Sequence, residues 1–162
     1  MRNNMINVIQ QNLRQNHMTK PHYTEQRQIT TEAALRAVEG AVQQALKLGI
    51  KINAAVCDAS GTPMAFLRMN GAPLHSITIS EDKAYTAASF GLPTSQWAHI
   101  LSDHSDGVRL GLPARPRFVQ FGGGLPISIN GTVIGGIGVS GGSEQQDEEC
   151  ARFGLITAEI ET

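Results

Sequence analysis

A glycine-rich stretch near the end of the chain constrains the fold more than any other feature of the sequence. Residues 134–142 read IGGIGVSGG, in which Gly136, Gly138 and Gly141 satisfy the spacing G-x-G-x-x-G. That spacing indicates dinucleotide binding only where it follows the first strand of a βαβ unit and opens a helix. The chain ends at Thr162, which leaves no room for a second parallel strand, so we expect no NAD site.

The same stretch fits the second strand of a β-hairpin. Asn130-Gly131 separates two apolar runs, residues 125–129 and 132–140, and Asn-Gly is the strongest short signal for a hairpin turn. Glycines in such a strand let a helix pack close to it and let the chain turn sharply after it.

The remaining elements follow from apolar runs, capping residues and chain breakers. A second hairpin is predicted over residues 52–58 and 63–68. Helices are predicted from Thr31 to Gly49, from His75 to Phe90, from a Thr94 cap to Ile100, and after a Ser143 cap. Residues 102–117 are predicted as a long irregular loop, and residues 118–121 as a further strand.

The predicted order is therefore α-β-β-α-α-(β)-β-β-α, which is typical of an α+β fold. Two hairpins joined by helices predict an antiparallel sheet of about five strands flanked by helices. We expect one domain over residues 26–162, preceded by a polar, flexible extension over residues 1–25 that is rich in Asn and Gln.

Composition narrows the classes of partner. Charged residues make up 17% of the chain and the net charge is −1, so no basic patch points to nucleic acid or to a membrane surface. The N-terminal residues contain no apolar segment of the secretory kind, and we expect a cytoplasmic location. Low charge together with 17 glycines suggests that part of the surface is covered by self-association.

Four blocks of sequence, taken in order, resemble the GlcG/HbpS-like haem-binding family, which includes the C-terminal domain of PduO-type cobalamin adenosyltransferases. The blocks are Phe66 to Ala72 (FLRMNGA), Lys83 to Ala87 (KAYTA), Phe121 to Pro126 (FGGGLP), and Ile137 to Gly141 followed by Gln145-Gln146-Asp147. The resemblance covers residues 30 to 160. Asn70 departs from it, because the family usually has Asp there.

The resemblance implies a homo-oligomeric accessory protein that binds haem or another small ligand. It also implies a setting in glycolate, glycerol, or diol and cobalamin metabolism. Because the homologous part of PduO-type proteins is the appended domain, we do not predict adenosyl transfer.

Candidate ligand-binding residues follow from what haem requires: an apolar slot, an axial ligand and cations for the propionates. His75, His104 and Met69 offer axial atoms, although either histidine also suits an ordinary surface position. Lys83 and Arg68 offer cations, and the amides of Gly122, Gly123 and Gly124 can cradle an anion. Lys83 can equally extend to solvent, and the three glycines can equally form a wide turn. Arg115 and Arg117, on either side of Pro116, make one face of the predicted loop over residues 102–117 cationic, which suits a carboxylate, although an exposed pair of loop arginines can equally be solvated.

Sequence motifs typical of enzymes are weaker than these indications of ligand binding. Gly138-Val139-Ser140-Gly141-Gly142 matches G-x-S-x-G, but no histidine follows Ser140, as a hydrolase of that class requires. No zinc-type spacing is present, and we expect no structural metal. Two alternatives to a binding protein stay open: an enzyme acting on a small metabolite or haem, with Lys83 or a histidine as acid–base group, and a structural assembly protein.

Overall fold

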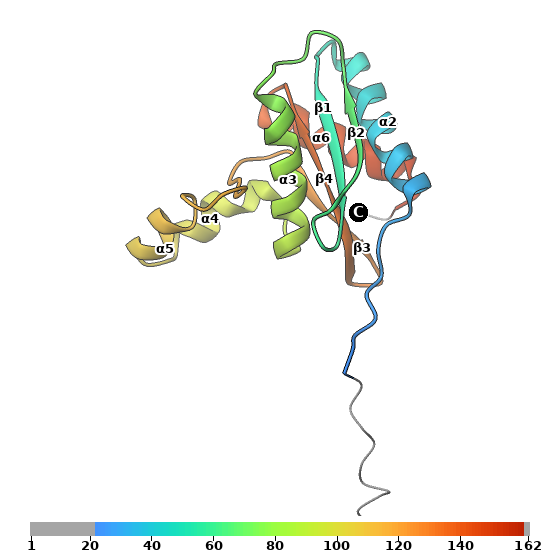
Figure 1. Cartoon of the computed structure of the whole chain (residues 1–162). Helices are drawn as coiled ribbons and strands as arrows, with labels where there is room; N and C mark the ends of the chain where they lie inside the picture. The colour runs from blue at the N-terminus through green and yellow to red at the C-terminus, as the bar shows by residue number, and fades with distance from the viewer. Residues whose placement is uncertain (1–21, 161–162) are drawn as a thin grey trace, which may run out of the picture.

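The computed structural model describes residues 22–160 and forms an α+β fold (Figure 1). In chain order the elements are α2 (Thr31–Leu48), β1 (Asn53–Asp58), β2 (Pro63–Arg68), α3 (Ser76–Phe90), the 3-10 helix η1 (Thr94–Gln96), α4 (Trp97–Ser102), α5 (Asp106–Gly111), β3 (Gly124–Ile129), β4 (Thr132–Ser140) and α6 (Glu144–Thr157).

The sheet is antiparallel, as predicted, with the strand order β2-β1-β4-β3. Within residues 22–160 it has four strands, so the expectation of about five was wrong. The segment predicted as a further strand, residues 118–121, instead runs along α3. The backbone N–H of Val119 donates to the hydroxyl of Thr86 at 3.1 Å rather than to a neighbouring strand.

Helices cover both faces of the sheet (Figure 1). On one face α2 and α6 bury a core that includes Val38, Ile52, Ile137 and Leu155. On the other face α3 packs its small side chains, among them Ala84 and Ala88, against β1. Side chains of a strand alternate between faces, so β4 directs Ile137 and Val139 to the α2–α6 side and Gly136 and Gly138 to α3.

Local capping follows the sequence. The hydroxyl of Thr30 accepts from the amide of Ala33, and Gly49 ends α2 in the left-handed conformation at φ 69°. Ser143 begins α6 in a reciprocal capping box with Gln146. The polar oxygens satisfy amides that an isolated helix end leaves without partners. Asn130 and Gly131 both adopt positive φ between β3 and β4, as the predicted hairpin turn requires.

The glycine-rich stretch is the centre of the sheet. β4 pairs antiparallel with β1 on one side and β3 on the other, which is not the parallel βαβ context of a dinucleotide site. A Cβ at Gly136 would collide with the carbonyl of Ala84, and a Cβ at Gly138 would collide with the carbonyl of Ser80. The glycines therefore allow the backbone of α3 to approach the strand, as predicted.

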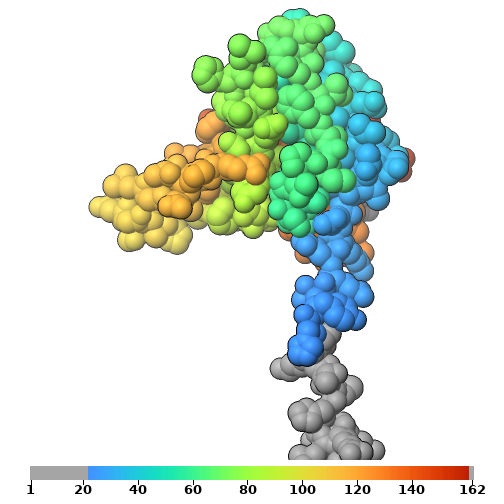
Figure 2. All heavy atoms as spheres, in the orientation of Figure 1, coloured from blue at the N-terminus to red at the C-terminus, as the bar shows by residue number. Residues whose placement is uncertain are grey.

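Residues 94–121 form an arm that projects from the body of the molecule (Figures 1 and 2). The expectation of an irregular loop over residues 102–117 was wrong in part, because α5 lies within it. None of the residues of α5 is buried, so the sequence shows no apolar periodicity there. Thr94 does not cap the helix as predicted, since its hydroxyl accepts instead from the amide of Gly124 at 2.8 Å.

The base of the arm is fixed by three aromatic rings. Trp97 stands edge-on to Phe90 and Phe118, with ring centroids 4.7 and 5.0 Å away. Such pairs contribute about 0.5–1.5 kcal/mol each beyond the area they bury. The predicted extension over residues 1–25 lies largely outside the described residues, and the domain boundary at residue 26 stays a prediction.

Candidate functional site

A buried lysine joins three elements of the fold. Lys83 leaves α3 with only 1% of its surface exposed. Its Nζ donates to the carbonyl of Val139 at the end of β4 and to Oδ2 of Asp147 in α6, both at 2.8 Å. The other carboxylate oxygen of Asp147 accepts from the amide of Gly142 at 2.8 Å. Lys83 thus neither extends to solvent nor faces an open pocket, because its anion is a carboxylate of the same chain.

Two opposing effects act on this amine. Burial lowers the pKa of Lys83 below its ordinary value of 10.5, because the charged form loses solvation, and the Asp147 carboxylate partly offsets this by favouring the charged form. An acid–base role for Lys83 would require the pair to open, since both of its hydrogen bonds lie in the protein interior.

The three consecutive glycines wrap around this pair. The amide of Gly122 donates to the Glu144 carboxylate, and that of Gly124 donates to Thr94, both at 2.8 Å. Gly123 has φ 116°, and a Cβ there would lie 2.6 Å from Nζ of Lys83. Side chains of the protein itself therefore occupy two of the amides that were candidates for cradling an anion.

A groove opens beside this turn, within the arm, between the α4–α5 region and residues 120–121, which lead toward β3. It has a volume of about 690 Å³ and is lined by Ala98, Leu101, Ser102, His104, Asp106, Arg109, Gln120 and Phe121. His104 lies between α4 and α5 and is exposed. This volume is within the range of roughly 300–1,000 Å³ that small-molecule sites occupy.

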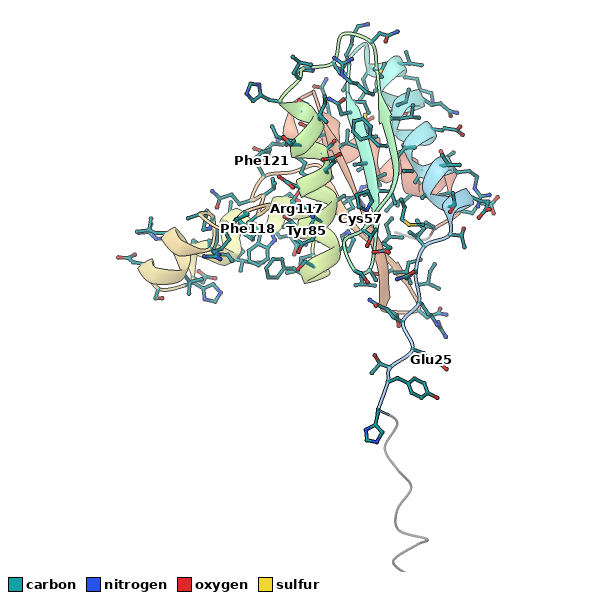
Figure 3. All side chains as sticks on the ribbon, viewed as in Figure 1. Glu25, Cys57, Tyr85, Arg117, Phe118 and Phe121 are labelled. Carbon is teal, nitrogen blue, oxygen red and sulfur yellow. The ribbon has the colours of Figure 1, made fainter. Side chains whose placement is uncertain are left out.

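Phe121 connects the groove to the buried pair. Its ring is 40% exposed and lies directly before the three glycines, and its centroid is 5.0 Å from Nζ of Lys83. Figure 3 shows Phe121 where the arm returns to α3. One wall of the groove therefore lies against the Lys83–Asp147 pair.

The arm also places charge in the groove. Nη2 of Arg109 lies 2.8 Å from Oδ1 of Asp106, and both side chains are more than half exposed. Exposed pairs of this kind contribute about 0–1 kcal/mol, so an anionic ligand can displace the Asp106 carboxylate at little cost.

The other predicted residues lie elsewhere. Arg68, at the end of the edge strand β2, donates to the carbonyl of Ala72 at 2.7 Å. Met69 packs against the α2–α6 core. His75 is exposed at the start of α3 and makes no capping hydrogen bond through its side chain. The structure therefore brings Lys83 and the three glycines together and places His104 in the adjoining groove. Arg68, Met69 and His75 lie away from this site.

Asp147, Phe121 and Arg109 were not among the predicted site residues. A lysine within a run of small residues needs a carboxylate partner if it is buried, and Asp147 was the acidic residue within the four blocks. That signal was sufficient to find the pair. Nothing in the sequence placed Phe121 and Arg109 on either side of one groove, because the course of the arm was not predicted.

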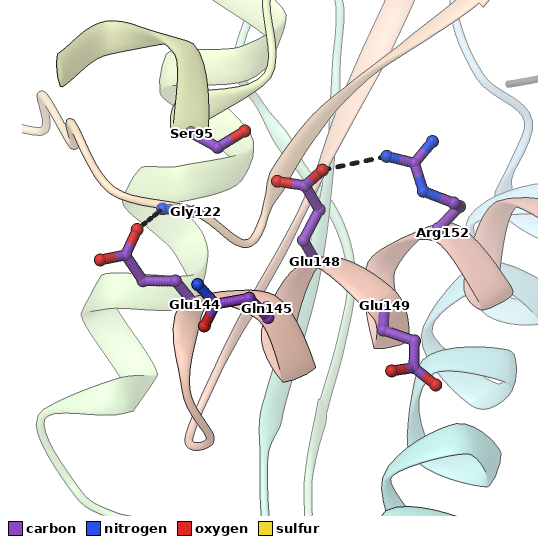
Figure 4. Close-up of a pocket in the computed structure, with 7 residues that line it drawn as sticks. All are labelled: Ser95, Gly122, Glu144, Gln145, Glu148, Glu149 and Arg152. Atoms are coloured by element: carbon purple, nitrogen blue, oxygen red, sulfur yellow. Dashed lines mark hydrogen bonds and ion pairs between the residues drawn. The ribbon is translucent and has the colours of Figure 1, made fainter. Parts of the chain in front are cut away.

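A second, acidic cleft of about 400 Å³ lies along α6 (Figure 4). Its carboxylates already have partners: Glu144 accepts from Gly122, Glu148 pairs with Arg152 at 2.9 Å, and Glu149 accepts from Gln44. Among residues 22–160, no three His, Cys, Asp or Glu side chains gather as metal ligands would. No helix in this part of the chain is long and apolar enough to cross a membrane.

Comparison with known proteins identifies the family. The family model described as "Haem degrading protein HbpS-like" matches residues 29–156. The chain belongs to the HbpS-like family. This confirms the resemblance drawn from the four blocks, which extend over the same part of the chain.

Two related sequences and one solved structure show what this chain is similar to. A protein of Citrobacter freundii, described as an uncharacterized 15.0 kDa protein in the dhaT-dhaS intergenic region, is 35% identical over 127 residues, covering 78% of this chain and 89% of its own length. The corrinoid adenosyltransferase PduO of Salmonella typhimurium is 30% identical over 148 residues, but this match covers only 43% of PduO and 88% of this chain. A crystal structure of a PduOC–haem complex superposes with a TM-score of 0.76 at 28% identity, covering 83% of this chain and 98% of that one.

Proposed function

We propose that this protein binds haem in the groove of the arm, between the α4–α5 region and residues 120–121, with His104 as the axial ligand. The observation that carries the proposal is the placement of an exposed histidine, an aromatic ring and an arginine around one groove of suitable size. The haem complex of a similarly folded relative supports the choice of ligand.

The residues present fit the chemical needs of haem. His104 supplies an imidazole nitrogen, Leu101 and Phe121 supply apolar surface for the macrocycle, and Arg109 supplies a cation for a propionate. Haem bound here would bring redox-active iron to the surface of the arm. The protein's own part is to hold the ring, orient the axial imidazole and neutralise the propionate charge.

We further propose that the protein acts as a homo-oligomer. The groove is open on one side, so a second copy placed against the arm would complete its wall and exclude water from the ring. Leu110, with 70% of its surface exposed, supplies apolar contact area on the same arm.

We infer an accessory role in glycolate, glycerol, or diol and cobalamin metabolism from the relatives. PduO is a corrinoid adenosyltransferase by name, and this chain matches less than half of it. The proposal is therefore a binding role and not adenosyl transfer. The alternative of an enzyme that uses Lys83 is less well supported, because the amine is buried and paired.

An absorbance titration with haemin tests the groove. The wild-type protein is compared with His104→Ala and with two control variants: His99→Ala, an exposed histidine on the same arm, and His75→Ala at the start of α3. We expect a saturable shift of the Soret band, lost in His104→Ala and retained in both controls. If the Soret shift is lost in His75→Ala and retained in His104→Ala, the axial ligand is His75 and the proposed groove is wrong. A non-saturating response in the wild type would overturn haem binding.

A further inference from the structure

A third, smaller pocket lies where the arm meets α3, between α3 and residues 112–118. It has a volume of about 160 Å³, and its lining includes Tyr85, Phe90, Phe118, Arg115 and Arg117. The volume is well below the roughly 300 Å³ at which sites for drug-sized molecules begin. A ligand of this pocket is therefore a small molecule, far smaller than a macrocycle.

The walls of the pocket are aromatic and are held in place. The ring of Phe118 stands edge-on to that of Phe90, with centroids 5.9 Å apart, and both rings pack against Trp97. Figure 3 shows Phe118, Arg117 and Tyr85 together where the arm meets α3. A flat, apolar ligand body suits such a wall, because aromatic rings pack edge-on or offset against one another.

Arg117 is built into the pocket by several contacts. Its backbone has φ 65°, a left-handed conformation that residues other than glycine rarely adopt. Its carbonyl accepts from the hydroxyl of Thr86 at 2.8 Å, its Nε pairs with Asp82 at 2.9 Å, and its guanidinium lies 3.8 Å from the ring centroid of Tyr85. A left-handed residue fixed by so many neighbours is typical of a binding site.

Arg115 differs from Arg117 because it forms no ion pair with any other residue in the part of the chain that the structure describes. Asp82 compensates the charge of Arg117, so one positive charge at the rim of the aromatic pocket stays uncompensated. A guanidinium binds carboxylates through charge-assisted hydrogen bonds, often two at once. The chemistry of the pocket thus combines a flat apolar wall with a single carboxylate-binding group.

We propose that this pocket binds a small planar monocarboxylate, with its carboxylate on Arg115 and its apolar body against Phe90 and Phe118. The site is separate from the proposed haem groove, because the two pockets share no lining residue. The two proposals therefore stand or fail independently.

The test uses sodium benzoate as the probe and the fluorescence of Trp97, the single tryptophan of the chain, as the readout. Trp97 contacts both aromatic walls, so a bound ring changes its surroundings. Benzamide, which has the same shape without the charge, is the control ligand. We expect a saturable change with benzoate and binding at least tenfold weaker with benzamide.

Two variants complete the design. Arg115→Gln removes an exposed charge and should weaken benzoate binding at least tenfold, whereas Arg36→Gln, an exposed arginine on α2, should leave it unchanged. Saturation-transfer NMR on benzoate provides a second readout for each variant. The proposal is overturned if neither method detects binding to the wild type, or if Arg115→Gln binds benzoate as well as the wild type. Haemin binding by Arg115→Gln should match the wild type.

Discussion

At the scale of single residues, the Lys83–Asp147 pair is the most consequential contact in the molecule. Lys83→Met leaves the Asp147 carboxylate buried without its cation, and breaking a buried pair in this way costs about 3–5 kcal/mol. We expect a loss of that size in the free energy of unfolding, measured by urea denaturation at neutral pH. A loss below about 1 kcal/mol would show that the pair contributes little to stability.

The double variant Lys83→Met with Asp147→Asn separates charge from packing. Asn keeps an oxygen that can accept from the amide of Gly142 but carries no charge. It should therefore recover at least half of the stability lost in Lys83→Met alone. If the double variant is no more stable than the single one, the loss comes from altered packing around α3 rather than from an unpaired carboxylate.

The two cysteines form a second prediction at this scale. Burial raises the pKa of the Cys57 thiol from 9.0 to about 11 and that of Cys150 to about 12. Both thiols should resist Ellman's reagent at pH 8 in the folded protein and react fully in guanidinium chloride, because the thiolate is the reactive form. The folded state holds these protons more tightly than the unfolded state, so their contribution to stability is complete below pH 9 and declines as the pH rises through 11. Rapid reaction of the folded protein would contradict the burial of both thiols.

At the scale of elements, the contact between α3 and β4 depends on glycine. Gly138→Ala forces a methyl group against the carbonyl of Ser80, and overpacking of this kind costs about 1–3 kcal/mol. Gly111→Ala is the matched control, because a Cβ there meets no atom within 4 Å. We expect thermal denaturation to show a lowered midpoint for Gly138→Ala alone. Equal midpoints for the two variants would mean that close approach is not the function of the β4 glycines.

The same elements show which parts of the fold the sequence could predict. Both hairpins, α2, α3 and α6 were predicted, because caps such as Thr30 and Ser143 and the Asn130-Gly131 turn act through neighbouring residues. In the arm, the helical segment from Thr94 to Ile100 was predicted. Helix α5 was not, because it buries nothing, and the 118–121 segment was wrongly predicted as a strand, because it is held by a long-range bond to Thr86. The same holds for the candidate site. The four sequence blocks contain Lys83 and the three glycines, so these residues could be predicted, whereas the groove could not, because it depends on the path of the arm.

At the scale of the whole molecule, the arm is the surface through which we expect copies of the 17.4 kDa chain to associate. Sedimentation velocity should give a mass that is a multiple of this value. Leu110→Glu should reduce that mass, because Leu110 exposes an apolar side chain on the arm. Leu74→Glu is the control, since Leu74 is 74% exposed outside the arm. A monomeric wild type would contradict self-association, and loss of association only in Leu74→Glu would exclude the arm.

The attachment of the arm has a consequence for how the molecule opens. β4 lies between two strands and against α3, so we expect its amide hydrogens to exchange with solvent only when the sheet itself opens. Residues 102–110 of the arm are all exposed, so we expect their amides to belong to a unit that opens at lower free energy. We therefore expect the side of the groove formed by His104, Asp106 and Arg109 to open locally while the sheet stays intact. A flat, rigid ligand can then enter the groove without the cost of unfolding the domain.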